Sequence, residues 1–147
     1  MTASPDSGSG HERAMCRLVF GVHDVRIPTS DPWASRNWYM SVLAFESVLD
    51  LQEADGLVGV VLRHPSDVTV GLHLDPRRAM ALKGFALLVL AVPDRVALEA
   101  CAIDLDRVGQ THSPIAQGHL GWYLDVPDPD GILIRFHTKT SFDSEEA

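Results

Sequence analysis

The chain has 147 residues, of which 46% are hydrophobic and 22% charged, so it is long enough for one domain with a buried core. Its formal net charge of −8 disfavours nucleic acid and anionic membrane surfaces as partners, because both bind clusters of Lys and Arg. The apolar run Phe85–Val92 is the longest, and it is much shorter than the roughly 18 residues of a membrane-spanning helix.

The two ends of the chain differ in composition from its middle. Residues 1–12 are rich in Ser, Gly and Pro and contain no apolar stretch typical of a signal peptide. We therefore expect a cytoplasmic protein with a disordered tail over residues 1–15, a single domain over residues 16–140, and a frayed acidic tail over residues 141–147. The two cysteines are isolated, which argues against a disulfide framework.

The first half of the domain begins with a strand signal and continues with a helix signal. The segment Leu18–Ile27 is typical of a strand. Asp31 is a suitable N-cap and Pro32 a suitable first helical residue, which predicts a helix to about Leu43. Three strands are expected to follow, over Phe45–Leu51, Leu57–Arg63 and Val68–Leu74. The Asp55-Gly56 pair predicts a hairpin turn between the first two of these strands.

The same order of elements then begins again, after a linker over residues 75–83 that could hold a helical turn. The strongly apolar segment Phe85–Val92 predicts a strand, and Pro93-Asp94 ends it. A helix is expected over Arg95–Val108, with Gly109 just beyond its C-terminal end. A short strand or loop is then expected through Ser113-Pro114, and two strands follow it, over Gly118–Val126 and Ile132–Thr138. A strand, a helix and three strands therefore occur twice, which indicates an internal duplication.

A tight turn, Asp128-Pro129-Asp130-Gly131, leads into the last of these strands. The Asp-Gly pair supplies the residue with positive φ that such a turn needs. This turn and strand, together with the repeated strand–Pro–Asp–helix segments, resemble the vicinal oxygen chelate superfamily, which includes glyoxalases, extradiol dioxygenases and bleomycin-resistance proteins. The resemblance covers about Leu18–Thr138. It implies an α+β fold in which two tandem βαβββ modules, about residues 18–75 and 84–138, form two curved sheets around a cleft. It also implies a homodimer.

The resemblance further implies where metal ligands would lie. In metal-using members a His stands seven residues before the Asp that opens the helix of each half, and a Glu stands four residues after the Gly of the last turn. The residues at these positions are Asp24, Leu87 and Arg135. Leu has no lone pair and Arg is a permanent cation, so we expect no cofactor at this site. A divalent metal would need a divergent site made from Asp24, His73 and His137.

Strand alternation predicts which side chains share the cleft. Asp24 and Arg26 lie on one face of the first strand, and Arg135 and His137 on one face of the last. The candidate ligand-binding residues are therefore Asp24, Arg26, His73, Leu87, Trp122, Arg135 and His137, and Tyr123 could line the cleft beside Trp122. Arg135 could pair with Asp24 in place of a metal, or stay free to hold an anionic ligand. His73 is either a sheet-surface residue or, if it faces the cleft, a general base.

These residues support one main hypothesis and two alternatives. The main hypothesis is a protein similar to the bleomycin-resistance type, which binds a small amphipathic or anionic organic ligand in the cleft without a metal. The first alternative is a glyoxalase-like lyase or isomerase, or a dioxygenase, with a divergent metal site. The second is a degenerate paralogue that has only a structural or dimerisation role.

Overall fold

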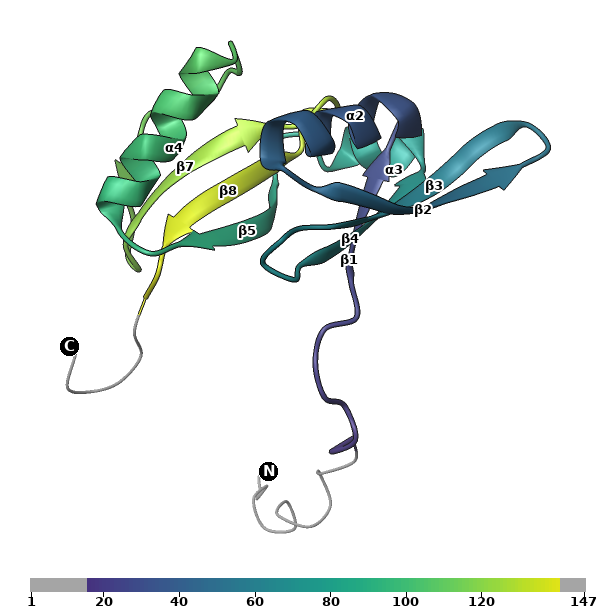
Figure 1. Ribbon diagram of the computed structural model, residues 1–147, viewed down its shortest axis with the longest axis horizontal. Helices are drawn as coiled ribbons and strands as arrows, with labels where there is room; N and C mark the ends of the chain where they lie inside the picture. Colours follow the sequence, from purple (N-terminus) through teal and green to yellow (C-terminus); the bar gives the residue numbers. More distant parts are fainter. Residues whose placement is uncertain (1–15, 141–147) are drawn as a thin grey trace, which may run out of the picture.

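The computed structural model describes residues 16–140, so the two predicted tails lie outside the described residues. The first module consists of β1 (Val25–Thr29), α2 (Pro32–Leu43), β2 (Glu46–Glu53), β3 (Gly56–Arg63) and β4 (Thr69–Leu74). A short helix, α3 (Pro76–Ala81), leads to the second module. That module consists of β5 (Ala86–Val92), α4 (Arg95–Arg107), β6 (Ala116–Gln117), β7 (Trp122–Pro127) and β8 (Leu133–Thr138). The predicted α+β fold of two βαβββ modules is confirmed (Figure 1).

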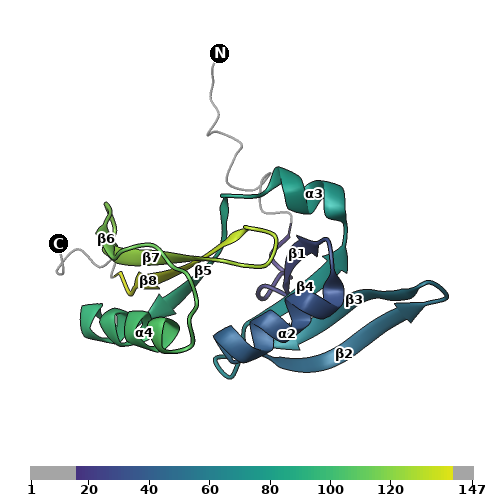
Figure 2. The same ribbon diagram turned by 90° about the horizontal axis from the view of Figure 1, so that it is seen from above.

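Each module forms one four-stranded mixed sheet with the same topology. The strand order is β1-β4-β3-β2 in the first sheet and β5-β8-β7-β6 in the second. In each, the first strand runs parallel to its neighbour, and the other neighbours are antiparallel. Figure 2 shows α2 and α4 on the same side of the two sheets. We call this the helix side, and the opposite face of each sheet the open side.

Both long helices begin as their sequences predict. The carboxylate of Asp31 accepts a hydrogen bond of 3.2 Å from the backbone N–H of Ala34, and Pro32 is the first helical residue of α2. The carboxylate of Asp94 caps α4 in the same way, at 2.9 Å from the backbone nitrogen of Ala97. Among the described residues, no helix has both the length and the apolar character needed to span a membrane.

The core lies on the helix side of each sheet. In the first module, Ile27, Val60 and Leu72 project from the sheet onto α2, whose Tyr39 is fully buried. In the second module, the buried residues of the sheet pack against two residues of α4; the sheet residues are Leu88, Leu124, Val126, Ile134 and Phe136, and the helix residues are Leu98 and Leu105. Burying each large apolar side chain stabilises the fold by roughly 1.5–3 kcal/mol. The residues that alternate with these point to the open side.

Two predicted element bounds are wrong. The first strand begins at Val25, not at Leu18, because residues 18–22 have no pairing partner among the described strands and their side chains are exposed. The strand expected over residues 118–126 begins only at Trp122, because residues 118–121 form the turn between β6 and β7, in which Gly121 has a φ of 143°. The linker, in contrast, contains the helical turn that its sequence allowed: it is α3, whose N-cap is Asp75.

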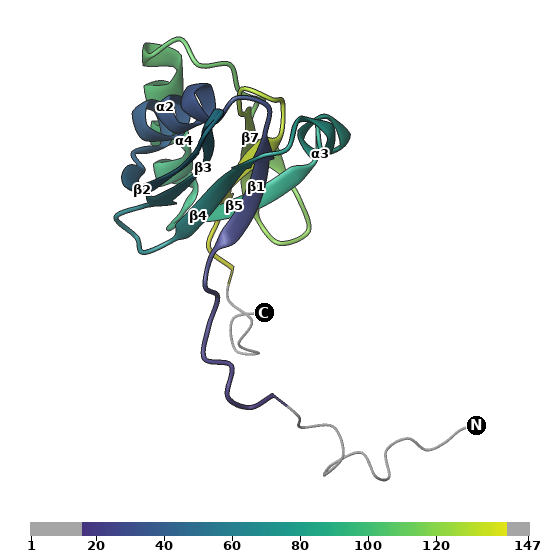
Figure 3. The same cartoon turned by 90° about the vertical axis from the view of Figure 1, so that its right-hand side faces the viewer.

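The turn between β7 and β8 fastens the two modules together. The Tyr39 hydroxyl on α2 donates a hydrogen bond of 3.0 Å to Asp128 Oδ2. The other oxygen of Asp128 accepts hydrogen bonds from the backbone nitrogens of Asp130 and Ile132, at 2.9 and 3.0 Å. The Ser30 hydroxyl and backbone N–H both donate to the Asp130 carboxylate. The turn that suggested the fold is therefore also a contact between the two modules, whose backbones Figure 3 shows from the side.

Candidate functional site

The open side of the second sheet carries an arginine that is held in place by a neighbouring carboxylate. Arg135 on β8 donates two hydrogen bonds to Asp125 on β7, from Nε to Oδ1 at 2.8 Å and from the terminal nitrogen to Oδ2 at 3.1 Å. The two residues are direct partners in the β7–β8 register. This geometry raises the pKa of Arg135, mainly through the hydrogen bonds to Asp125. Neither alternative considered for Arg135, a pair with Asp24 or an unpaired guanidinium, is correct, because Arg135 pairs with Asp125.

Two aromatic rings, those of Tyr123 and His137, lie beside this ion pair on the same face of the sheet. The Arg135 guanidinium lies 4.0 Å from the centre of the Tyr123 ring, in a cation–π contact. The Tyr123 and His137 rings are nearly parallel, with centres 6.1 Å apart. His137 Nδ1 lies 2.6 Å from the backbone carbonyl of Thr138 and must donate to it, so Nε2 of the neutral ring is an acceptor. We call Tyr123, Asp125, Arg135 and His137 the open-side row.

The first sheet also has an acidic side chain on its open side. Asp24, just before β1, accepts a hydrogen bond of 2.9 Å from His23 Nδ1, and a quarter of its side chain is exposed. Its Oδ2 lies 2.8 Å from where a β-carbon on Gly71 would stand. The glycine therefore makes room for the carboxylate. Arg26, the register partner of Gly71, is exposed.

His73 on β4 faces the open side, because its neighbour Leu72 is buried in the core. It lies between Pro28 and Gly59 in the sheet register. Its Nδ1 is buried and has no hydrogen-bond partner among the described residues. A buried polar atom without a partner is costly, so a bound ligand or water that supplied one would be stabilised there.

Two of the predicted site residues lie elsewhere. The extra residue of a β-bulge between Ala86 and Leu88 is Leu87, and its side chain packs against the core. Trp122 alternates with Tyr123 and packs on the helix side, where the Arg95 guanidinium lies 3.8 Å from its ring centre. The open side therefore carries Asp24, Arg26, His73, Arg135 and His137 of the predicted set.

The residue that the sequence reasoning missed is Asp125. The alternation of side chains along β8 predicts which face of the sheet Arg135 lies on, but it does not predict which residue of the next strand lies beside it. The tight turn between β7 and β8 carries that information, because it makes Pro127 the partner of Leu133 and therefore Asp125 the partner of Arg135. Counting outward from the turn would have found the pair.

The donor set does not fit the metal that the fold implies. Of the three expected ligand positions, Leu87 is a partly buried apolar residue packed against the core, and Arg135 is a cation held by Asp125. Within residues 16–140, no three or more His, Cys, Asp or Glu side chains lie close enough together to hold a metal ion. The divergent set of Asp24, His73 and His137 therefore does not form a metal site among the described residues.

Comparison with known proteins gives structural relatives only. No family model matches the chain, and no curated protein matches it. It is similar to a glyoxylase/bleomycin resistance protein/dioxygenase domain from Frankia sp. EAN1pec, with a TM-score of 0.66, 18% identity, and coverage of 87% of this chain and 98% of that one. It is also similar to TnmS3, an antibiotic-binding protein from Streptomyces sp. CB03234, with a TM-score of 0.67, 19% identity and coverage of 83% and 98%.

A third similar structure is a lactoylglutathione lyase from Agrobacterium tumefaciens, with a TM-score of 0.63, 13% identity, and coverage of 80% of this chain and 92% of that one. The three proteins differ in described activity but share the paired-module architecture with this chain. At these identities the likeness establishes the fold alone. The fold of this chain is that of the glyoxalase/bleomycin resistance/dioxygenase superfamily, the vicinal oxygen chelate fold.

Proposed function

We propose that the protein binds a small amphipathic organic ligand on its open side, without a metal. The observation that carries this proposal is the open-side row, in which Asp125 fixes the Arg135 guanidinium over the Tyr123 ring. Arg has five N–H donors, and the pair with Asp125 uses two of them. The remaining donors can bind a carboxylate or carbonyl of a ligand whose flat apolar part stacks on the neighbouring rings.

The charge balance of the row narrows the ligand class. Asp125 offsets the charge of Arg135, so the row favours one acceptor group on an otherwise apolar molecule over a polyanion. Apolar side chains extend the surface around it: Val89, the register partner of Arg135, is 54% exposed, and Ala91 is the partner of His137. The antibiotic-binding description of one similar protein supports a small organic ligand of this kind.

We further propose that the protein is a homodimer. On the open side of the first sheet, Leu49 and Leu51 of β2 are 53% and 45% exposed. Large exposed apolar side chains on a sheet face are typical of an interface. Light scattering at micromolar concentration should give twice the monomer mass. A monomer at that concentration would contradict this assignment.

Calorimetric titration with 2-naphthoate, a flat aromatic carboxylate, tests the ligand proposal. Arg135→Lys keeps the charge but loses the planar fork, so we expect binding to weaken about tenfold. The matched control is Arg95→Gln, which removes the same kind of cation–π contact from the helix side of the same sheet. This variant should bind as the wild type does.

Equal affinity of the Arg135 and Arg95 variants would overturn the open-side assignment. Absence of saturable binding for 2-naphthoate and other aromatic acids would instead favour a purely structural or dimerisation role. Retention of binding after treatment with a chelator is expected, because no step depends on a metal.

A further inference from the structure

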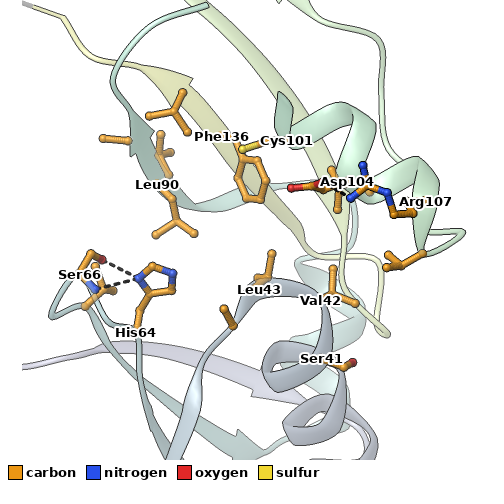
Figure 4. Close-up of a pocket in the computed structure, with 17 residues that line it drawn as sticks. Ser41, Val42, Leu43, His64, Ser66, Leu90, Cys101, Asp104, Arg107 and Phe136 are labelled. Atoms are coloured by element: carbon orange, nitrogen blue, oxygen red, sulfur yellow. Dashed lines mark hydrogen bonds and ion pairs between the residues drawn. The ribbon is translucent and has the colours of Figure 1, made fainter. Parts of the chain in front are cut away.

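A cavity lies on the helix side, where the two modules meet. It has a volume of about 870 Å³ and is bounded by the C-terminal turn of α2, the β3–β4 turn, β5 and α4 (Figure 4). Its apolar lining includes Leu43, Val68, Leu90, Leu105 and Phe136. Small-molecule sites typically enclose about 300–1,000 Å³, so the volume suits one organic ligand. We call this cavity the helix-side groove.

One polar side chain is directed into the groove. His64 Nδ1 accepts a hydrogen bond of 3.0 Å from the backbone N–H of Ser66 and lies 2.7 Å from the Ser66 hydroxyl oxygen. Because a backbone N–H can only donate, the proton of the neutral ring is on Nε2. Figure 4 shows this second ring nitrogen turned away from Ser66 and toward the groove. Nε2 has no hydrogen-bond partner among the described residues.

The imidazole is held in this orientation from two directions. Ser66 fixes its Nδ1 edge, and the ring of Phe45, a buried residue, meets it edge-on with ring centres 5.3 Å apart. A donor that is already oriented loses little entropy when a ligand binds. The ring therefore offers one preorganised N–H to an acceptor atom inside an apolar cavity.

The opposite rim of the groove carries no net charge. Arg107 and Asp104 of α4 form an ion pair of 2.6 Å, and both side chains are about 70% exposed. Cys101, half-buried on the same helix, places a thiol in the lining. The groove thus combines an apolar body, one directed donor and a neutral rim, which selects for an apolar molecule with one acceptor group.

We propose that the helix-side groove is a second ligand site, separate from the open-side row, and that it binds an apolar molecule whose carboxylate or carbonyl oxygen accepts from His64 Nε2. An ammonium head group cannot accept this hydrogen bond, so an amine of the same apolar shape binds poorly. This site does not depend on Arg135.

Protection of Cys101 from alkylation tests the proposal directly. In a Cys16→Ser variant, Cys101 is the sole thiol of the chain. Decanoate should slow its reaction with iodoacetamide about tenfold at saturation, whereas decylamine at the same concentration should not. His64→Phe keeps a ring against Phe45 but removes the donor, and should weaken protection by decanoate about tenfold. Arg135→Lys should leave protection unchanged, which separates this site from the open side.

A second variant guards against loss of folding in His64→Phe. Val108 lines the groove and is 64% exposed, so Val108→Trp can fill the cavity without disturbing the core. It should abolish protection by decanoate. No protection of the parent, equal protection by decylamine, or full protection in both variants would overturn the proposal. So would protection that rises with protein concentration in the absence of decanoate, because a second copy of the chain would then cover the groove.

Discussion

The hydroxyl of Tyr39 donates a hydrogen bond of 3.0 Å to Asp128, joining the helix of the first module to the last turn of the second. Both side chains are buried, with 0% and 5% exposure. Burial raises the pKa of Asp128, although Tyr39 and two backbone N–H groups donate to its carboxylate. Burial, followed by the neighbouring carboxylate, raises the pKa of Tyr39. One carboxyl group therefore shapes the turn and holds the modules together.

Removing the Tyr39 hydroxyl should destabilise the protein. We expect Tyr39→Phe to lower the free energy of unfolding by about 1–2 kcal/mol, because one buried oxygen of Asp128 loses its partner. Urea unfolding measures the change. Tyr123→Phe is the matched control, since its ring lies on the open side and no hydrogen bond of its hydroxyl occurs among the described residues. Equal stability of the two variants would contradict the role of this contact.

Substitution by Ala should destabilise the protein more at Gly131, in the last turn, than at Gly84. Gly131 has a φ of 81°, and a β-carbon there would stand 2.9 Å from Lys83 Cγ; Gly84 has a φ of 84° and nothing within 4 Å. Replacing either by Ala strains the backbone, at a cost of about 1–2 kcal/mol. Gly131→Ala should cost more in urea unfolding. In a Lys83→Ala background the two costs should become equal, and a persistent difference would show that the lysine contact is not the cause.

His112 makes the stability depend on pH. Its Nδ1 lies 2.7 Å from the Ser113 carbonyl and its Nε2 lies 2.8 Å from the Asp106 carboxylate, so both nitrogens face acceptors. These contacts, the Ser113 carbonyl first, raise the pKa of His112 above its ordinary value of 6.5. The stabilisation is complete below the unfolded-state pKa and is lost as the pH rises through the folded-state pKa.

Urea unfolding between pH 5.5 and 8.5 checks this dependence. The free energy of unfolding should fall as the pH rises through this window, and His112→Gln should remove that part of the fall. His119→Gln, which changes an exposed histidine, is the control and should keep the wild-type profile. Identical profiles for the two variants would show that His112 is not the titrating group.

The order of elements could be predicted because local residues encode it. Asp31-Pro32 and Pro93-Asp94 mark the start of each long helix; the structure confirms the predicted cap at Asp31 and adds a cap at Asp94. The stretch Leu18–Val22 was mistaken for a strand because a strand also needs a partner, which composition does not reveal. Alternation gave the faces of Arg135 and His137. The prediction that Trp122 lines the cleft beside Tyr123 is wrong, because neighbouring residues of a strand face opposite sides, and the bulge at Leu87 shifts the pattern in β5.

Neighbours across strands and between modules were harder to predict. The partner of Arg135 depends on the register of two strands, and spacing along one strand does not give it. The helix-side groove brings His64 of the first module close to Leu90, Cys101 and Phe136 of the second. No segment of the sequence contains that combination, so packing of the modules alone creates it.

Elemental analysis of the untagged protein tests metal independence most directly. Samples are incubated separately with Ni²⁺, Zn²⁺, Fe²⁺ and Mn²⁺ and then desalted. Because Leu87 has no ligand atom and Arg135 is a cation held by Asp125, we expect far less than one metal per chain in every sample. About one metal per chain, lost again in Asp24→Ala, would contradict metal-independent binding and would point to a metal enzyme built around Asp24.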